Sequence, residues 1–280
     1  MECLDLNKLP VGCVSVILSL TSPPDACKSS LVSTTFQSAA ESDLVWERFL
    51  PSDYREIVSK ASNTFKFSSK KELYLLLCNP VLVADGKTSF KLERSTGRKS
   101  YILSARELSI SCSNDQMFWV WKSIPESRFS EVAELRTISR LEIHGKIRTK
   151  ILSPNTTYGA YLLLKLADRA YGLDILPSET SVEIGNQAFV NTAYLRSQDS
   201  KKQQMENLFY SNRKHMLKSR VIEGDDRVLS KREDGWMEIE LGEFFNGEDD
   251  EEVKMSLMEV KGQQLKGGLI IEGIEVRPKT

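Results

Sequence analysis

The stretch Leu141-Glu142-Ile143-His144-Gly145-Lys146-Ile147-Arg148-Thr149-Lys150-Ile151 alternates apolar and polar side chains along its length. Successive residues of a strand point to opposite sides of a sheet, so one face of this segment is aliphatic. That face carries Leu141, Ile143, Ile147 and Ile151. The opposite face carries Glu142, His144, Lys146, Arg148 and Lys150. The alternation predicts a β-strand over 141–151 with one buried side and one solvent-facing side.

Other segments repeat this period of two on both sides of that strand. Phe90–Arg94, the turn Ser95-Thr96-Gly97 and Ser100–Leu103 are typical of a β-hairpin. Further strands are predicted at 158–166, 181–184, 236–241, 253–260 and 269–276. Many strands with one polar face and few long helical patterns between them favour an antiparallel, jelly-roll-like β-sandwich over residues 90–280.

The first fifty residues instead show helical spacing. Val14, Ile17 and Leu18 form one apolar stripe. Ser22-Pro23-Pro24-Asp25 ends that helix and starts a second, whose apolar side we assign to Leu31, Val32 and Phe36. A third helix follows from Ser42 or Asp43 to Leu50, before Pro51. We therefore predict a three-helix unit over 1–50.

So small a unit buries little surface and is marginal on its own. It holds more large apolar residues than three short helices can cover, so we expect a partner subunit to bind it. The residues predicted to form that surface are Leu9, Pro10, Val14, Ile17, Leu18, Leu31, Val32 and Trp46. The alternative is that these side chains form an internal three-helix core alone.

A helical connector is predicted over 51–89, where Ser69-Lys70-Lys71-Glu72 has the pattern of a capping box. The fold class is thus α+β, with helices at 1–50, a connector at 51–89 and a sandwich at 90–280. Within the sandwich, residues 196–232 contain ten Lys or Arg and five Asp or Glu. We interpret this segment as a basic, partly disordered surface loop; an acidic partner or a nuclear import signal is the alternative.

The composition argues against several classes of function. The net charge of −1 gives no reason to expect nucleic-acid binding. The five cysteines lack C-x-x-C spacing and the two histidines are isolated, so we expect no zinc site, cofactor or disulfide framework. The apolar stretch 11–20 is too short to span a membrane and follows acidic rather than basic residues. These features favour a protein of the cytoplasm, the nucleus or both.

The chain resembles a known family over nearly its whole length. Leu9-Pro10, Asp25-Ala26-Cys27 and Val45-Trp46 are similar to the plant F-box. Trp119-Val120-Trp121, Gly235-Trp236 and Gly273–Pro278 are similar to the phloem protein 2 domain of the Nictaba-like lectins. This resemblance implies an F-box that binds the Skp-type adaptor of a cullin–RING ubiquitin ligase. The sandwich would then bind a target protein, some relatives recognising glycans that contain N-acetylglucosamine.

The same resemblance implies that Trp119, with Trp121, takes part in carbohydrate binding. Cys112 and Arg140, however, stand where the lectin relatives have tryptophan, which removes two ring planes. The alternative is that Trp119, Trp121 or both pack inside the sandwich, since residues two apart share one face of a strand. Trp236 is expected in the core.

An enzyme is not expected. Glu238 and Glu240 share a strand face like a pair of catalytic carboxylates, but alternating glutamates on a solvated face are far commoner. His144 has no accompanying nucleophile motif. The favoured function is a non-catalytic adaptor that recruits substrates to a ubiquitin ligase. The alternatives are an intracellular lectin with an idle F-box and a protein–protein module that binds no sugar.

Overall fold

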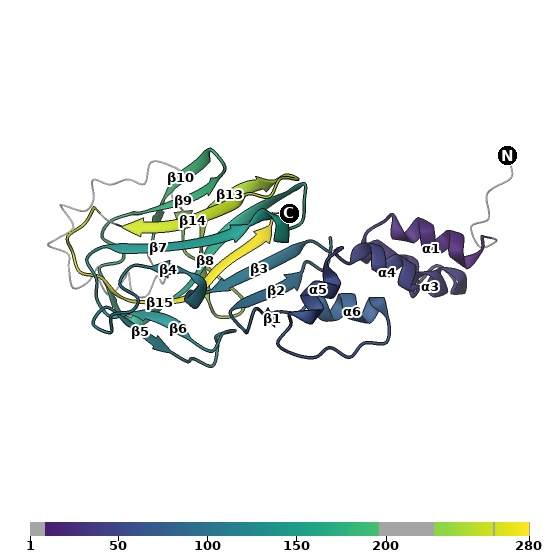
Figure 1. Cartoon of the computed structure of the whole chain (residues 1–280), viewed down its shortest axis with the longest axis horizontal. Helices are drawn as coiled ribbons and strands as arrows, with labels where there is room; N and C mark the ends of the chain where they lie inside the picture. The colour runs from purple at the N-terminus through teal and green to yellow at the C-terminus, as the bar shows by residue number, and fades with distance from the viewer. Residues whose placement is uncertain (1–8, 196–226, 260, 280) are drawn as a thin grey trace, which may run out of the picture.

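The computed structural model describes residues 9–195, 227–259 and 261–279. Helices form an arm at one end of the molecule and strands form a sandwich at the other (Figure 1). This is the α+β class that the sequence predicted. The helices are α1 (Val11–Ser19), α2 (Pro23–Ser29), α3 (Thr34–Ala40), α4 (Asp43–Phe49), α5 (Tyr54–Ser59) and α6 (Lys70–Leu77).

Serine caps start most of these short helices. The side chains of Ser22, Ser33 and Ser42 accept hydrogen bonds from backbone N–H groups in the first turn of α2, α3 and α4. Ser69 caps α6 as predicted, accepting from the N–H of Glu72 at 3.2 Å. The Glu72 carboxylate does not complete the usual capping box, because it binds the N–H and hydroxyl of Ser68 instead.

The predicted second helix is wrong in its extent. Helix α2 ends at Ser29, and Leu31 and Val32 lie in the turn before α3 rather than on a helical face. The cause is Ser33, whose side chain accepts the N–H of Phe36 at 3.3 Å and thereby starts a new helix. Residues 9–50 consequently hold four helices instead of three.

Two sheets face each other in the sandwich. The larger has the order β1-β2-β3-β15-β8-β13-β12, with β6 on β15 and β5 on β6; the smaller has the order β11-β10-β9-β14-β7-β4. Every pair is antiparallel except β10 with β11. The strands are β1 (Val81–Val83), β2 (Thr88–Leu92), β3 (Lys99–Ser104), β4 (Ser109–Ile110), β5 (Trp119–Lys122), β6 (Val132–Leu135), β7 (Leu141–Arg148), β8 (Thr156–Tyr171), β9 (Ser178–Ile184), β10 (Gln187–Tyr194), β11 (Arg227–Val228), β12 (Ser230–Lys231), β13 (Met237–Asn246), β14 (Glu252–Glu259) and β15 (Gly267–Pro278).

The predicted hairpin and the five further strands are confirmed, but the strand predicted over 141–151 ends at Arg148. Thr149 still bonds to the facing segment, through its N–H to the carbonyl of Glu251 at 2.9 Å and through its hydroxyl to the carbonyl of Asp249 at 2.8 Å. A short 3₁₀ turn follows, and Ile151 is 37% exposed rather than buried.

The sheet also reaches beyond its predicted limits. Strand β1 begins at Val81, inside the segment 51–89 that was predicted to be a helical connector. Strands β11 and β12 likewise lie at the end of the segment 196–232, which was predicted to be a loop. Residues 196–226 of that loop lie outside the described residues.

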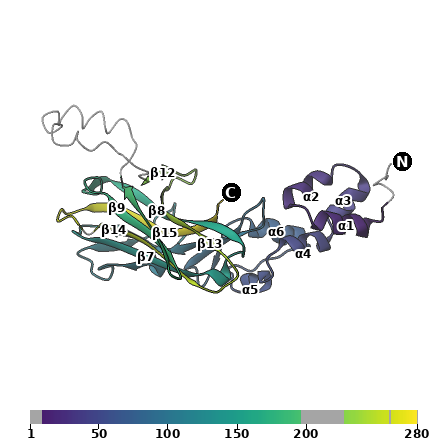
Figure 2. The same ribbon diagram turned by 90° about the horizontal axis from the view of Figure 1, so that it is seen from above.

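The sheets pack closely where glycine removes a side chain. A Cβ on Gly145 of β7 would lie 2.8 Å from Ile274 of β15, and one on Gly242 of β13 would lie 2.6 Å from Val182 of β9. The core between the sheets is therefore built by the alternating inward residues of both layers, as in other sandwiches. Viewed from above, the layers lie one over the other and the helical arm extends from one end (Figure 2).

The arm and the sandwich share one apolar core. Tyr74 of α6 is buried, and its hydroxyl lies 3.3 and 3.2 Å from the carbonyl oxygens of Glu93 and Arg94 in the β2–β3 turn. Gly97 of that turn has φ 72°, and a Cβ there would lie 2.7 Å from the carbonyl oxygen of Phe49. Lys99, itself buried, forms an ion pair at 3.0 Å with Asp53. These contacts fix the sandwich against the helices.

Gly273 offers a test of the sheet. It pairs with Ser104 beside a β-bulge, and a methyl group there would collide with the main-chain carbonyl of Leu103. Backbone atoms cannot give way as side chains do, so we expect Gly273→Ala to lower the free energy of unfolding by roughly 4 kcal/mol. Urea unfolding measures this. Gly247→Ala, where nothing lies within 4 Å, is the matched control and should change little.

Candidate functional site

The surface of the helical arm carries aliphatic side chains in contact with water. Leu31 is 87% exposed, Val32 is 67% exposed and Ile17 is 47% exposed. These three belong to the surface predicted for a partner subunit. We call them, with the further exposed residues Val11, Val16, Leu20 and Leu44, the aliphatic set. Pro10, also in the prediction, is exposed, and Leu9 is half-buried against the core.

Three residues of the predicted surface lie inside the molecule instead. Val14 and Leu18 are buried on the face of α1 that packs against α3 and α4. Trp46 is also buried: its indole N–H donates to the carbonyl of Ala40 at 2.6 Å, and its ring lies 5.2 Å from that of Tyr74. The prediction of a partner contact is therefore corrected for Val14, Leu18 and Trp46, which form the internal core.

Sequence reasoning missed Val11, Val16, Leu20 and Leu44. For Val11, Val16 and Leu20 the available signal was in α1, Val11–Ser19, which contains no charged residue; Leu44 lies on α4, where no such signal exists. A helix that is apolar on all sides is normally buried on all sides. Since the arm can cover only the Val14 and Leu18 side of this helix, the remaining aliphatic side chains stay exposed.

The tryptophans predicted for sugar binding are placed differently from one another. Trp119 is buried, and its indole N–H donates to the carbonyl of Ser111 at 3.0 Å, so it offers no open ring face. Trp121 is half-buried, and the guanidinium of Arg106 lies 3.6 Å from its ring centroid. Arg106 is itself held by Glu131 at 2.7 Å. For Trp119, stacking on a sugar is thus corrected to packing in the core.

The other positions singled out in the sandwich are also accounted for. Cys112 and Arg140, the two positions at which the sequence resemblance implied a lost tryptophan, are both exposed. Trp236 is buried as predicted, in a small cluster with Val132 and Ile270. Among the described residues, no group of histidine, cysteine and carboxylate side chains is arranged to hold a metal ion.

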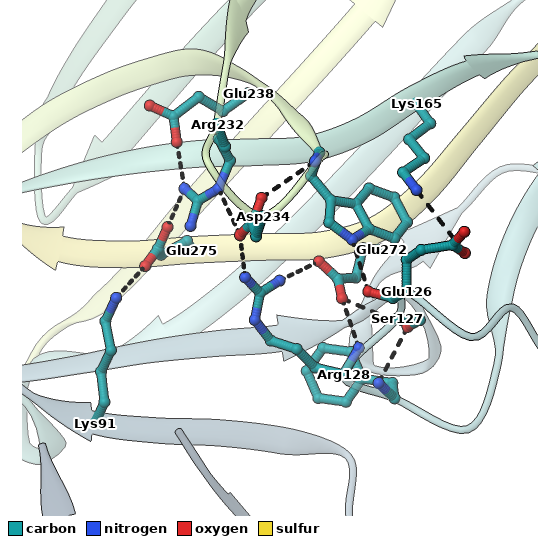
Figure 3. A network of polar contacts seen from close by, with 12 residues as sticks. Lys91, Glu126, Ser127, Arg128, Lys165, Arg232, Asp234, Glu238, Glu272 and Glu275 are labelled. Carbon is teal, nitrogen blue, oxygen red and sulfur yellow. Dashed lines mark hydrogen bonds and ion pairs between the residues drawn. The ribbon is translucent and has the colours of Figure 1, made fainter. Parts of the chain in front are cut away.

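A network of ion pairs crosses the outer side of the larger sheet (Figure 3). Glu275 of β15 is fully buried and is approached by Arg232 at 2.6 Å, Arg277 at 2.8 Å and Lys91 at 3.3 Å. Arg232 and Arg277 also bind Glu238 of β13. Glu238 is thus the partner of two arginines, and the neighbouring Glu240 pairs with Lys279 at 3.1 Å. This pairing gives both carboxylates a structural role.

The loop between β5 and β6 is attached to the same network. Arg128 binds the buried carboxylate of Glu272 at 2.5 Å and also contacts Asp234. The indole N–H of Trp236 donates to the carbonyl of Glu126 at 3.1 Å. Phe129 packs with Ile102 and Leu163 on the sheet beneath. The loop therefore closes this face of the larger sheet.

The two buried glutamates of β15 differ in electrostatics. Burial raises the pKa of Glu272 above its usual range, because the attraction of Arg128 compensates the lost hydration only in part. Burial also acts to raise the pKa of Glu275. In that case the positive charges of Lys91, Arg232 and Arg277 outweigh burial and hold the pKa below the usual value. Glu275 is consequently the ionised centre of the network.

Comparison with known proteins agrees with the helical arm and the sandwich. Residues 6–48 match the F-box domain and residues 98–278 match the family described as Phloem protein 2. F-box protein PP2-B15 of Arabidopsis thaliana is 51% identical over 97% of this chain and 96% of its own length. F-box protein VBF of the same organism is 50% identical over 97% of this chain and 99% of its own length.

A third relative, F-box protein PP2-B13 of Arabidopsis thaliana, is 52% identical over 96% of this chain and 98% of its own length. The molecule is thus an F-box followed by a mostly antiparallel β-domain. The chain belongs to the family of F-box proteins with a phloem protein 2 domain. In the described part of the chain, no helix has the length and apolar character needed to cross a bilayer.

Replacing Trp119 tests its assignment to the core. We expect Trp119→Ala to lower the free energy of unfolding by about 3–5 kcal/mol, since a large buried side chain leaves a cavity. Trp121→Ala should cost less, because that ring is only half-buried. Thermal or urea unfolding of the two variants measures the difference. Equal stability of Trp119→Ala and the native chain would contradict the core assignment.

The Glu275 network should make stability depend on pH. The pKa of Glu275 is lowered in the folded state. The contribution of this carboxylate to the free energy of unfolding is therefore present above the ordinary glutamate range and is lost as the pH falls through the folded-state pKa. Glu275→Gln should therefore cost roughly 3 kcal/mol at about pH 7 and much less at about pH 3. Urea unfolding at both pH values measures this. The matched control is Glu252→Gln, at an exposed pair with Lys146, which should cost less than ~1 kcal/mol.

Proposed function

We propose that this protein is the substrate receptor of a Skp–cullin–F-box ubiquitin ligase. The aliphatic set of the F-box supports an interface with an Skp-type adaptor, because a small arm presents Ile17, Leu31 and Val32 to water. Exposed apolar groups gathered on so small a unit favour a protein partner. The adaptor would link the chain to a cullin–RING ligase, and the chain itself would supply no catalytic group.

The energetics are sufficient for such a complex. Full burial of one Val, Leu or Ile side chain gains about 1.5–3 kcal/mol. Part of this gain offsets the loss of translational and rotational freedom on association. The seven residues of the aliphatic set therefore provide enough apolar surface for a stable complex, without help from Val14, Leu18 or Trp46.

The sandwich would hold the target at a defined place. Because Tyr74, Gly97 and Lys99 fix it to the arm, a bound target has a restricted position relative to the adaptor. Restricting position raises the effective concentration of a target near the site of ubiquitin transfer. We place this activity in the cytoplasm, the nucleus or both, where ubiquitin ligases of this class work.

The alternative, an intracellular lectin with an idle F-box, has less support. Trp119 is buried and Arg106 covers one face of Trp121, so neither tryptophan presents a free stacking plane of the kind that carbohydrate binding uses. A glycoprotein target with N-acetylglucosamine-containing glycans would therefore need contacts other than these two tryptophans.

Adaptor capture tests the proposal directly. The double substitution Leu31→Asp and Val32→Asp places charges at two highly exposed positions, so the fold should persist while docking is lost. Loss of two aliphatic contacts corresponds to ~3–6 kcal/mol, or more than a hundredfold in affinity. Co-purification and isothermal titration with a recombinant Skp-type adaptor measure this.

Phe245→Asp is the matched control, since Phe245 is an exposed apolar residue on β13 of the sandwich. It should leave adaptor capture unchanged. Circular dichroism of all variants reports whether the helices remain folded. Undiminished capture by the Leu31, Val32 double variant would show that the interface lies elsewhere.

A further inference from the structure

Strand β10 forms an open edge of the smaller sheet. On one side it pairs with β9 from Gln187 with Ile184 to Ala193 with Ser178. On the other side, β11 pairs only with Ala193 and Tyr194. Among the described residues, no strand pairs with the outer edge of 187–192. The described part of the chain therefore leaves a row of backbone N–H and C=O groups there for a further strand.

Strand β10 itself carries none of the sequence features that normally protect an edge. Natural proteins protect edge strands with charged residues, proline or bulges, whereas Gln187–Tyr194 contains no charge and no proline and pairs with β9 in continuous register. Two apolar side chains are exposed on it, Phe189 at 45% and Val190 at 56%. An uncharged, partly apolar edge of this kind favours strand addition.

The two faces of the edge are chemically different. Phe189 lies opposite the core residue Val182, so it points towards the space between the sheets. Val190 lies opposite Ser181, on the solvent side. An added strand would place alternate side chains beside each of these residues, which requires apolar or β-branched residues at both kinds of position.

The charge of the neighbouring strand β9 favours basic over acidic side chains on an added strand. The exposed residues Glu179 and Glu183 of β9 lie opposite Thr192 and Ala188, on the same side of the sheet as Val190. They are two strand spacings, about 10 Å, from an added strand. At that distance acidic side chains of the added strand would be repelled, and lysine or arginine would be preferred.

The size of the edge indicates what occupies it. Six residues of strand span about 20 Å. A stable interface between folded proteins buries about 20–30 residues on each side, which is far more than this edge offers to a second copy of the chain. A short extended segment of another protein matches the available length. The edge also lies on the sandwich, away from the F-box helices, so adaptor binding leaves it free (Figure 1).

We propose that the edge of β10 at residues 187–192 is the site where the receptor binds its target, by pairing with an extended, non-acidic segment of that protein. The proposal rests on the function of substrate receptor given above and names the kind of partner that the sandwich takes. Backbone hydrogen bonds supply the affinity, and the surroundings of Phe189 and Val190 select the alternate side chains.

The test begins with an unbiased selection of ligands. A phage library of random twelve-residue peptides is selected on the intact chain bound to its Skp-type adaptor. Selected sequences should be rich in β-branched and aromatic residues and poor in Asp and Glu. Binding of labelled synthetic copies is then measured by fluorescence anisotropy, and hydrogen exchange should show slower exchange of the amides in 187–192 when peptide is present.

Two variants locate the site. Val190→Lys places a charge on the edge and should weaken peptide binding at least tenfold. Met117→Lys adds the same charge at an exposed apolar residue before β5 and should leave binding unchanged. Peptides methylated on the N–H groups of alternate residues should lose binding in one register and keep it in the other, as pairing through one strand edge requires.

Three results would overturn the proposal. They are selection of no peptide, protection outside β10, and full protection of 187–192 in the free chain, which would mean that the edge is already covered. Adaptor capture is measured on the same samples. If the native chain fails to capture the adaptor yet binds peptide at β10, the substrate-receptor function is wrong and the strand-pairing site stands by itself.

Discussion

The packing of Tyr74 joins the two parts of this molecule. Its ring lies against Trp46 of the F-box, and its hydroxyl bonds to the β2–β3 turn of the sandwich. Burial raises the pKa of this phenol well above its ordinary range, so it remains a neutral donor at any physiological pH. A helical arm too small to form a stable core alone is thereby completed by the sandwich.

That arrangement decides which F-box residues can meet a partner. Trp46 packs against Tyr74 of α6, and Val14 and Leu18 lie in the contact of α1 with α3 and α4. The apolar residues left over, led by Leu31 and Val32, are those that no internal neighbour covers. Stability of the arm and affinity for a partner therefore draw on different residues of the same short sequence.

The strands were predictable because alternation is local. Leu141, Ile143 and Ile147 are buried in turn, as their spacing indicates. The end of that strand was not predictable, since Thr149 bonds to residues one hundred positions further along the chain. The same limit applies to the sites. The sequence identified Ile17, Leu31, Val32, Val14, Leu18 and Trp46 equally as candidates for a partner surface. Only the packing of α3, α4 and α6 shows that Val14, Leu18 and Trp46 are covered. Trp119 and Trp121 are also indistinguishable by pattern until Ser111 and Arg106 are placed around them.

The two sheets of the sandwich differ in how far other segments cover them. The outer face of the larger sheet is closed by the β5–β6 loop. In this loop Arg128 forms an ion pair with Glu272, and Phe129 packs against Leu163. The smaller sheet has no such cover over β10 among the described residues. Because Tyr74 and Lys99 hold the arm against the sandwich, an edge of the sandwich has a defined position relative to the F-box. A target paired there would be presented in one orientation, which a flexible linker could not achieve.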